Sequence, residues 1–297
     1  MVNMIDQIKQ RFLILGGSSR IASMMIKSWD IKSSIEVISQ YRQTISDIKT
    51  HLPFHRQISF DPLNYNSSIV KKLSKIDTVI CLAGISSGTK SELFLNTQLA
   101  EASLKLSEDI GAKRLFYASS AAVYGYGNSL TEQDTTNPVS NYGQSKLEAE
   151  RFLEESNSCV SIISMRMGNA LFADSITGQL TPPPLENLIN LDFFPDGRSL
   201  CRSYIDPISL SRIINSLSDL SLKGFNILNI ASIEEIEADQ LLNKLKVPWI
   251  KNNRAKWDGQ KITISTRLLH ELLINSNLSN CWTKSLYDWS NIKKELN

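Results

Sequence analysis

Three side chains in the middle of the chain could together take the proton of an alcohol as a hydride leaves the same carbon. They are Ser120, Tyr142 and Lys146, and the tyrosine and the lysine are four residues apart. On a helix this spacing places both side chains on one face. An ammonium beside a phenol favours the phenolate, so we expect Lys146 to lower the pKa of Tyr142 towards working pH. A tyrosine in that state can accept the proton of a substrate hydroxyl while a hydride leaves the same carbon.

A strand and a helix must bring these side chains together. Leu115 to Ala118 is a short apolar run with two aromatic residues, which indicates a buried strand that ends at Ser119 and Ser120. The C-terminal ends of parallel strands open into a ligand crevice. Other apolar runs, alternating with helical segments, lie at 11–15, 35–39, 77–83, 160–165 and 225–230. This alternation predicts an α/β fold with a Rossmann-type, doubly wound parallel sheet.

The first apolar run is followed by a turn of small residues, Gly16 to Ala22. A strand, a glycine turn and a helix form the usual context for binding a dinucleotide, because the backbone can approach the pyrophosphate and the helix N-terminus attracts it. A NAD enzyme usually carries an acidic residue at the end of its second strand, to bond the ribose 2′-hydroxyl. Gln40 and Tyr41 occupy that place here.

The absence of a carboxylate at that position bears on the choice of cofactor. It removes a charge that would repel a 2′-phosphate, and Arg42, or Arg20 in the glycine turn, could pair with one. The alternative is that both arginines are ordinary surface residues. We therefore expect NAD or NADP as cofactor, with NADP slightly favoured.

Composition narrows the class of protein. The chain has 297 residues and a net charge of +2, which gives no reason to expect a nucleic-acid or membrane partner. Its 4 cysteines and 3 histidines are scattered, so no metal site is expected. The apolar run near the N-terminus is too short for a signal peptide or a membrane span. A cytoplasmic enzyme with one or two domains is the expectation.

The central segment resembles the extended branch of the short-chain dehydrogenase/reductase family, which contains NAD-dependent nucleotide-sugar epimerases, dehydratases and ketoreductases. The resemblance is carried by the run Ser-Ser-Ala-Ala-Val-Tyr-Gly at 119–125 and by Tyr142-Gly-Gln-Ser-Lys146. It implies that Ser120, Tyr142 and Lys146 are the catalytic residues. It also implies a structural role for Asn96, and a third strand at 58–61 that ends in Asp61.

The resemblance extends to the cofactor site. Of the family pattern Gly-x-x-Gly-x-x-Gly only Gly16 is kept, while Ser19 and Ala22 hold the other two glycine positions. Ser19 is the main departure, because its side chain is expected to intrude where the backbone should come close. The implied cofactor-binding residues are Gly16, Ser18, Ser19, Arg20, Ile21, Arg42, Asp61, Leu82, Ala83, Gly84, Tyr142 and Lys146.

The substrate site is expected mainly from the second half of the chain. The resemblance implies that Asn169 and Ser120 contact a nucleotide-sugar and that Arg202 and Arg254 hold its diphosphate, for which guanidinium groups are suited. Residues 1–169, with 201–230 returning to them, should form the dinucleotide domain, and 170–200 with 231–297 the smaller substrate-binding lobe. A homodimer built on helices near 91–110 and 142–157 is implied as well.

The two residues after Ser120 narrow the reaction. The 4,6-dehydratases of this family place an Asp-Glu pair directly after the catalytic hydroxyl residue, but Ala121 and Ala122 stand there and cannot move a proton. We therefore expect a nucleotide-sugar epimerase, 4-epimerase-like, ahead of an NADPH-dependent 4-ketoreductase. An alternative of a different class is a protein that binds a dinucleotide but catalyses no reaction, and the altered glycine turn is the reason to consider it. The Ser-Tyr-Lys set argues against that class.

Overall fold

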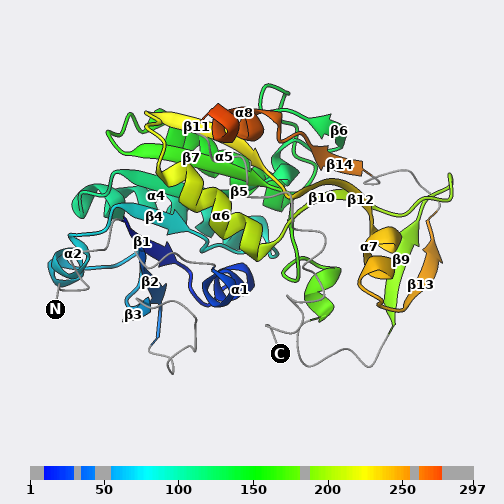
Figure 1. The fold of residues 1–297 in the computed structure, drawn as a ribbon, viewed down its shortest axis with the longest axis horizontal. Helices are drawn as coiled ribbons and strands as arrows, with labels where there is room; N and C mark the ends of the chain where they lie inside the picture. The colour runs from blue at the N-terminus through cyan, green and yellow to red at the C-terminus, as the bar shows by residue number, and fades with distance from the viewer. Residues whose placement is uncertain (1–9, 30–34, 44–54, 181–187, 255–260, 276–297) are drawn as a thin grey trace.

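The fold is that of a computed structural model, in which residues 10–29, 35–43, 55–180, 188–254 and 261–275 are described (Figure 1). Its centre is a sheet of seven parallel strands in the order β11-β7-β5-β4-β1-β2-β3. These strands are β1 (Gln10–Leu15), β2 (Ile35–Tyr41), β3 (His55–Ser59), β4 (Thr78–Cys81), β5 (Arg114–Ser120), β7 (Ser161–Met167) and β11 (Phe225–Ile230). The order reverses direction at β1 and β4, where open α/β sheets bind their ligands. The predicted Rossmann-type fold is confirmed.

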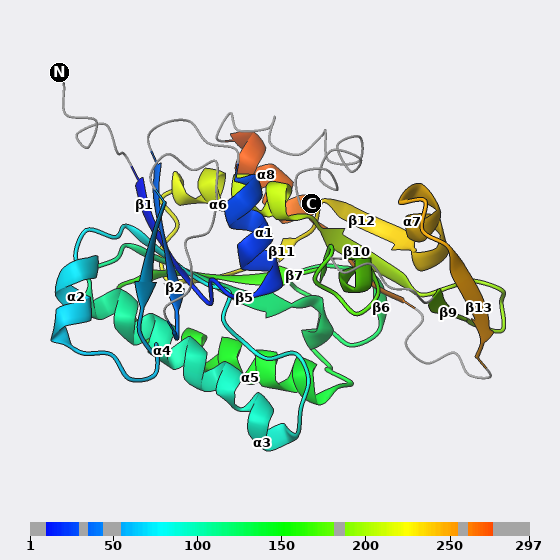
Figure 2. The same ribbon diagram turned by 90° about the horizontal axis from the view of Figure 1, so that it is seen from below.

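Helices cover both faces of this sheet (Figure 2). One face carries α1 (Arg20–Ser28), α6 (Pro207–Ser218) and α8 (Arg267–Asn275). The other carries α2 (Ser67–Leu73), α3 (Lys90–Leu93), α4 (Leu95–Asp109) and α5 (Asn141–Glu155). Side chains cap the start of several helices; Ser140, for example, caps α5 by accepting from Gly143 N–H at 3.0 Å.

Strand β1 shows how the two cores arise. Its side chains alternate between the faces, as the pleat of a strand requires. Phe12 and Ile14 belong to the core under α1 and α6, whereas Leu13 and Leu15 belong to the core under α4 and α5. All four are essentially fully buried. A central parallel strand buried on both sides must be apolar throughout, which is why the run was recognisable in the sequence.

A second, smaller region lies beyond the carboxyl ends of the parallel strands (Figure 1). It has a sheet in the order β12-β10-β14-β6, with β8 paired to β10, and a two-stranded sheet of β9 and β13. These strands are β6 (Gly127–Leu130), β8 (Asn169–Ala170), β9 (Ile189–Phe193), β10 (Cys201–Ile205), β12 (Ile233–Glu237), β13 (Trp249–Asn253) and β14 (Lys261–Ile264). Helix α7 (Ala238–Lys244) and the 3₁₀ turns η2 (Ala121–Val123) and η3 (Thr177–Leu180) complete the described elements.

Some expected boundaries differ from the observed ones. Strand β3 begins and ends earlier than the expected strand at 58–61. Strand β10 joins the second sheet, although 201–230 were expected to return to the first, and β6 joins it from within the expected dinucleotide domain. Residues 181–187 and 255–260, and Cys281, lie outside the described residues. No helix in the described ranges combines the length and apolarity that crossing a bilayer requires.

Candidate active site

A pocket of about 230 Å³ opens at the carboxyl ends of β1, β2, β3 and β4. Its lining comes from the loops after these four strands and from α4: Gly16, Ser18, Ser19, Gln40, Tyr41, Arg42, Asp61, Pro62, Leu63, Ala83, Gly84, Ile85, Leu95 and Leu99. Seven of the residues expected to bind the cofactor therefore lie around one cavity, namely Gly16, Ser18, Ser19, Arg42, Asp61, Ala83 and Gly84. The topology of the sheet brings them together from four separate segments.

The turn after β1 needs its two glycines. Gly16 has φ +83°, and a Cβ on it would lie 2.7 Å from the Cα of Ala83. A Cβ on Gly17 would lie 2.8 Å from the ring of Tyr41. Only backbone fits at either position, so the loop stays low against its neighbours and leaves room above it. The family pattern singled out Gly16 alone, and the need for Gly17 was missed.

Ser19 does not behave as expected. It is the N-cap of α1, and its Oγ accepts a hydrogen bond from the Ala22 N–H at 3.3 Å. The side chain therefore turns towards its own helix while Ser19 still lines the pocket. Capping by serine satisfies one N–H of the helix start and keeps the positive end of the helix dipole at the pocket.

The remaining expected residues of this loop and of β4 have different surroundings. Ile21 and Leu82 are buried in the core under α1, so only their backbones could reach a cofactor. Arg20 is exposed, and its Nη1 donates to the carbonyl oxygen of Gly178 at 2.8 Å. This contact joins the start of α1 to the 3₁₀ turn η3.

Gln40, at the place of the expected ribose-binding acid, points inward. It is 2% exposed. Its Oε1 accepts from the Gly16 N–H at 3.0 Å, and its Nε2 donates to the carbonyl oxygen of Phe60. The amide therefore ties the glycine turn to the segment after β3. Arg42 is exposed at the rim of the same pocket, and Asp61 is exposed there with its Oδ1 accepting from Leu63 N–H at 3.0 Å.

Ser120 and Tyr142 meet where β5 ends and α5 begins. Ser120 is the last residue of β5, and its Oγ accepts from the Ala122 N–H at 3.2 Å, which caps η2. Tyr142 lies in the first turn of α5. A Cβ on Gly143 would collide with the carbonyl oxygen of Ala122, so this glycine permits α5 to approach η2 closely. The phenol of Tyr142 forms a side-chain hydrogen bond with Ser120.

Lys146 lies one helical turn further on and is 4% exposed. Its Nζ donates to the carbonyl oxygen of Ala118 at 2.8 Å and to the Tyr117 hydroxyl at 3.3 Å, and it stands 6.0 Å from the centre of the Tyr142 ring. Burial lowers the pKa of Lys146 to about 8, against the opposite effects of Cys81 and Glu150. A Cβ on Gly84 would come within 3.3 Å of the Lys146 Nζ. The loop that lines this pocket therefore adjoins the lysine that is expected to be catalytic.

The structure does not show the expected lowering of the Tyr142 pKa by Lys146. Burial raises the pKa of the Tyr142 phenol, and the hydrogen bond from Ser120 lowers it by less. The ammonium of Lys146 donates to Ala118 and Tyr117, and the Tyr142 ring is its more distant neighbour. The prediction that Lys146 brings the phenol pKa down towards neutrality was therefore wrong for this arrangement, because a sequence does not show what else the ammonium can reach.

Asn96, expected to be structural, connects the two halves of the site. It is fully buried in α4, and its Oδ1 accepts from Ile85 N–H at 3.0 Å. Its Nδ2 donates to the Ile85 carbonyl and to the Ser145 Oγ, both at 3.0 Å. The loop after β4 is thereby fixed against the helix that carries Tyr142 and Lys146.

A buried ion pair supports the end of β5 and was missed in the sequence. Glu150 and Arg166 are 2% and 4% exposed, and their Oε2 and Nη2 are 2.7 Å apart. Ser119 donates to the same carboxylate, and the guanidinium lies 4.7 Å from the centre of the Tyr124 ring. One signal was available: Glu150 stands four residues after Lys146, and therefore on the same face of α5.

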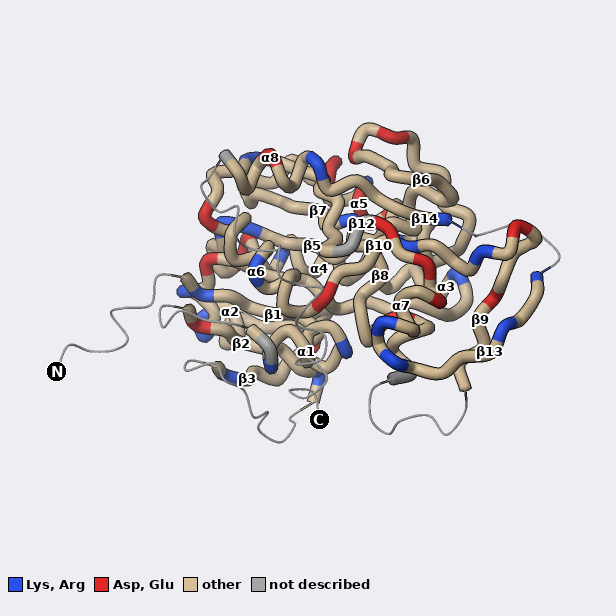
Figure 3. The backbone as a smooth tube through the Cα atoms, turned by 45° about the vertical axis from the view of Figure 1, so that its right-hand side comes forward, with Lys and Arg blue, Asp and Glu red and all other residues tan. Residues whose placement is uncertain are grey.

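The expected substrate residues are only partly brought together. Asn169 on β8 and Arg202 on β10 lie on paired strands; Asn169 Nδ2 donates to Asp174 at 3.1 Å and Arg202 Nη1 to the Cys201 carbonyl at 2.7 Å. Burial lowers the pKa of Arg202. Arg254 follows β13 of the two-stranded sheet, where charges of both signs occur (Figure 3), and it pairs with Asp192 at 2.9 Å.

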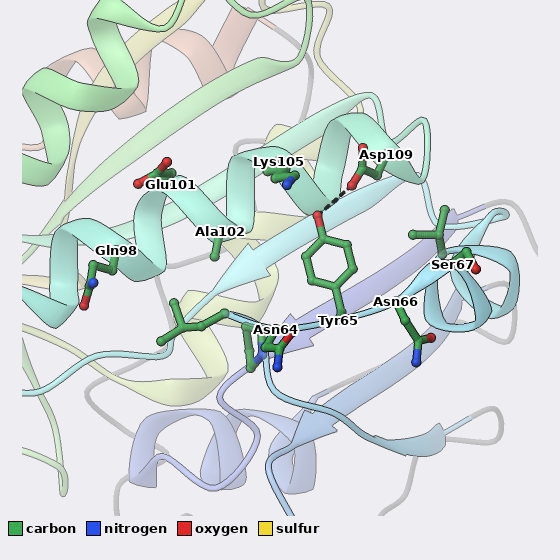
Figure 4. Close-up of a pocket in the computed structure, with 12 residues that line it drawn as sticks. Asn64, Tyr65, Asn66, Ser67, Gln98, Glu101, Ala102, Lys105 and Asp109 are labelled. Carbon is green, nitrogen blue, oxygen red and sulfur yellow. Dashed lines mark hydrogen bonds between the residues drawn. The ribbon is translucent and has the colours of Figure 1, made fainter.

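A second, larger groove of about 690 Å³ lies between α2, α4 and the segment after β3 (Figure 4). Its lining is mostly polar, and the Tyr65 hydroxyl donates across it to Asp109 at 2.7 Å. None of the expected catalytic residues lines it. Among the described residues, no group of three or more His, Cys, Asp or Glu side chains could hold a metal ion.

Solved structures of similar fold span nearly the whole chain. A UDP-glucuronic acid 4-epimerase variant from Bacillus cereus, bound to a UDP-sugar and NAD, has a TM-score of 0.72 at 17% identity, covering 96% of this chain and 99% of that one. MoeE5 with UDP-glucuronic acid and NAD has a TM-score of 0.69 at 18% identity, covering 95% and 99%. A dTDP-glucose 4,6-dehydratase from Bacillus anthracis with NAD has a TM-score of 0.69 at 16% identity, covering 96% and 98%. At these identities the likeness shows the fold.

Sequence comparison identifies the family. No curated protein matches the sequence in a direct search. The sequence model described as "NAD dependent epimerase/dehydratase family" matches residues 12–173. That span contains the glycine turn, the pocket loops and all three of Ser120, Tyr142 and Lys146. The match covers more than half of the sequence, and the chain belongs to the NAD-dependent epimerase/dehydratase family.

Proposed function

We propose that the protein is an NAD(P)-dependent nucleotide-sugar epimerase, 4-epimerase-like, with Tyr142 as its acid–base group. The observation that supports this is the junction between pocket and catalytic residues. Gly84 lines the dinucleotide pocket and lies against Lys146, while Ser120 and Tyr142 are hydrogen-bonded at the adjoining strand end. A hydride could therefore leave a sugar carbon while a proton leaves the hydroxyl on the same carbon.

The residues of the pocket fit a dinucleotide. The turn at Gly16 and Gly17 packs too closely against Ala83 and Tyr41 to admit a Cβ, so backbone alone faces the pocket there, and the helix α1 begins beside it. The backbone of this turn would hold the pyrophosphate, and Asp61 would contact the adenine end. NAD or NADP held there would supply the site where a hydride from the sugar carbon is stored and from which it is returned.

The side chains supply the remaining steps. Tyr142 takes the proton of the sugar hydroxyl and gives it back on return, and Ser120 orients the same oxygen. Lys146 would hold the nicotinamide ribose with its ammonium. After the first transfer the keto sugar rotates, so the second transfer reaches its other face and yields the epimer.

Epimerisation is preferred over dehydration on chemical grounds. The solved relatives of similar fold include both 4-epimerases and a 4,6-dehydratase. Elimination of water needs an acid–base pair beside the keto group. Ala121 and Ala122 follow Ser120 in η2, and neither has a group that transfers a proton.

For the substrate we propose a UDP- or dTDP-sugar. Arg202 would bind the diphosphate and Asn169 the nucleotide, since both lie on paired strands of the second sheet. The assignment of Arg254 to the same diphosphate stays a prediction, because its partner in this arrangement is Asp192.

The test is incubation with a panel of UDP- and dTDP-sugars without added reductant, with Tyr142→Phe as the control. Formation of an epimer, seen by NMR, with no net change in reduced nicotinamide supports the epimerase. Product that appears only with stoichiometric oxidation of NADPH would replace it with the ketoreductase. Dinucleotide binding without turnover of any sugar would indicate the non-catalytic binder.

A further inference from the structure

The ammonium of Lys146 is held by a neighbour that no family pattern singled out. Besides the Ala118 carbonyl, its Nζ donates to the Tyr117 hydroxyl at 3.3 Å and lies 4.9 Å from the centre of the Tyr117 ring. Tyr117 is on β5 and is fully buried. The phenol therefore offers Lys146 both a lone pair and the face of its ring, two contacts that favour a cation.

Tyr117 is itself oriented for this contact. Its hydroxyl donates to the backbone carbonyl of Asn96 at 3.4 Å, which leaves a lone pair for the Lys146 Nζ. Burial raises the pKa of Tyr117 well above its usual value, so the phenol stays neutral. It can accept a hydrogen bond from the ammonium without taking its proton.

We propose that Tyr117 is a positioning residue, which holds the Lys146 ammonium beside the Tyr142 ring and the dinucleotide pocket. The role in catalysis rests on the proposed function. The contact itself does not, because it can be measured in the free protein. The Tyr117 hydroxyl thereby fixes the position of Lys146 by a hydrogen bond, as Ser120 is hydrogen-bonded to Tyr142.

The charge on Lys146 is the measurable consequence. The titratable groups around it are Cys81 from β4, Tyr117 from β5, and Tyr142 and Glu150 from α5. With a pKa of about 8, Lys146 is charged below that pH and loses its charge as pH rises through it. Removal of the Tyr117 hydroxyl takes away an acceptor of the charged form, so the pKa of Lys146 falls further.

The decisive variant is Tyr117→Phe, which keeps the ring and removes one hydroxyl. Tyr124→Phe is the matched control, because Tyr124 is also buried and its hydroxyl donates to Asn229 at 2.8 Å. The pKa of Lys146 is followed by ¹³C NMR of protein labelled at lysine Cε, with the resonance assigned by Lys146→Met. We expect Tyr117→Phe to lower it by about one unit and Tyr124→Phe to leave it unchanged. Equal values in wild type and Tyr117→Phe would overturn the proposal.

A second measurement uses the wild type, so the proposal stays testable if Tyr117→Phe does not fold. In protein labelled at tyrosine Cζ, the Tyr117 resonance should shift with the midpoint of Lys146, while Tyr124 does not follow it. A Tyr117 resonance that ignores this titration would count against the contact.

Turnover then tests the catalytic part. With a sugar found in the panel, Tyr117→Phe should lower kcat about tenfold, change KM little, and move the alkaline limb of the pH–rate profile to lower pH. A residue needed only for packing would lower Tm and leave that limb in place. If no sugar is turned over, the proposed function fails, and the two titrations still decide whether Tyr117 holds Lys146.

Discussion

At the scale of single residues, the pKa of Tyr142 depends on its burial and on its neighbour Ser120. Burial raises its pKa, and the hydrogen bond from Ser120 opposes this. Because only the phenolate can take the proton of a sugar hydroxyl, the raised pKa means that the phenol must give up its own proton before it acts as the base. The groups next to it, Ser120 and Lys146, then determine how readily a proton passes.

Tyr142→Phe removes the phenolic hydroxyl and keeps the ring. We expect turnover to fall by about 10²–10⁴-fold, as for general acid–base groups elsewhere, while the fold and the affinity for dinucleotide are retained. Steady-state kinetics on the sugar found in the panel and calorimetric titration with NAD measure the two effects. A variant with nearly wild-type rate would show that Tyr142 is not the acid–base group.

Arg42 is predicted to set the choice of cofactor. Arg42 is exposed at the rim of the pocket, and position 40 carries no carboxylate that would repel a 2′-phosphate. NADP should therefore bind at least as tightly as NAD. Arg42→Ala should weaken NADP about tenfold and leave NAD unchanged, since only the former offers a phosphate to the guanidinium.

Calorimetric titration of both dinucleotides measures this difference. Arg267→Ala is the control, because Arg267 is 85% exposed on α8 and lies outside the pocket. A strong preference of the wild-type protein for NAD would contradict the proposed arginine–phosphate contact.

At this scale the sequence predicted which residues lie around the pocket better than it predicted the orientation of their side chains. Gly16 was predictable from the end of an apolar strand, Asp61 and Gly84 from the resemblance to the family, and all three line one pocket. The inward turn of Gln40 was not, because its partner Phe60 O is set by the packing of a different strand.

At the scale of elements, close approach between loops and helices builds the site. The turn after β1 lies against Ala83, and α5 lies against η2 at Gly143. Gly143 could have been noticed, since a glycine in the first turn of an otherwise good helix often has a packing reason. The strands of the second sheet were harder to find, because β6, β8 and β14 are short and have little periodicity.

Gly16→Ala tests the close approach at β1. The added Cβ meets the backbone of Ala83 and must adopt φ +83°, so we expect a loss of about 3 kcal/mol in the free energy of unfolding. Gly111→Ala is the matched control, because Gly111 has φ +70° with nothing within 4 Å of the added atom. Its cost should be about 1 kcal/mol.

Urea unfolding measures both variants, and titration with NAD follows the pocket. Gly16→Ala should also lose dinucleotide affinity, whereas Gly111→Ala should keep it. Equal destabilisation by the two substitutions would mean that the contact with Ala83 does not constrain the turn.

At the scale of the whole molecule, the two faces of the main sheet differ in what they offer a partner. Helices α3, α4 and α5 lie together on one face, and α8 lies on the other (Figure 2). Phe94, between α3 and α4, is 51% exposed. The homodimer implied by the family would use this face, and it stays a prediction, as does a cytoplasmic location.

Light scattering across micromolar concentrations tests the dimer. Phe94→Glu should weaken it at least about tenfold, because burial of an aromatic side chain would be replaced by burial of a charge. Ile274→Glu is the control, since Ile274 is 57% exposed on α8. A monomer at every concentration would contradict the prediction.

The inward amide of Gln40 also limits how this chain could change by selection. The shortest genetic route to an NAD-specific site would place a carboxylate at position 40. Here that carboxylate would lose the donor to Phe60 O and bring a negative charge against a carbonyl in a nearly sealed position. Such a variant should therefore be less stable than the wild type. Selection for a preference for NAD, in nature or in the laboratory, should therefore replace Arg42 and retain Gln40.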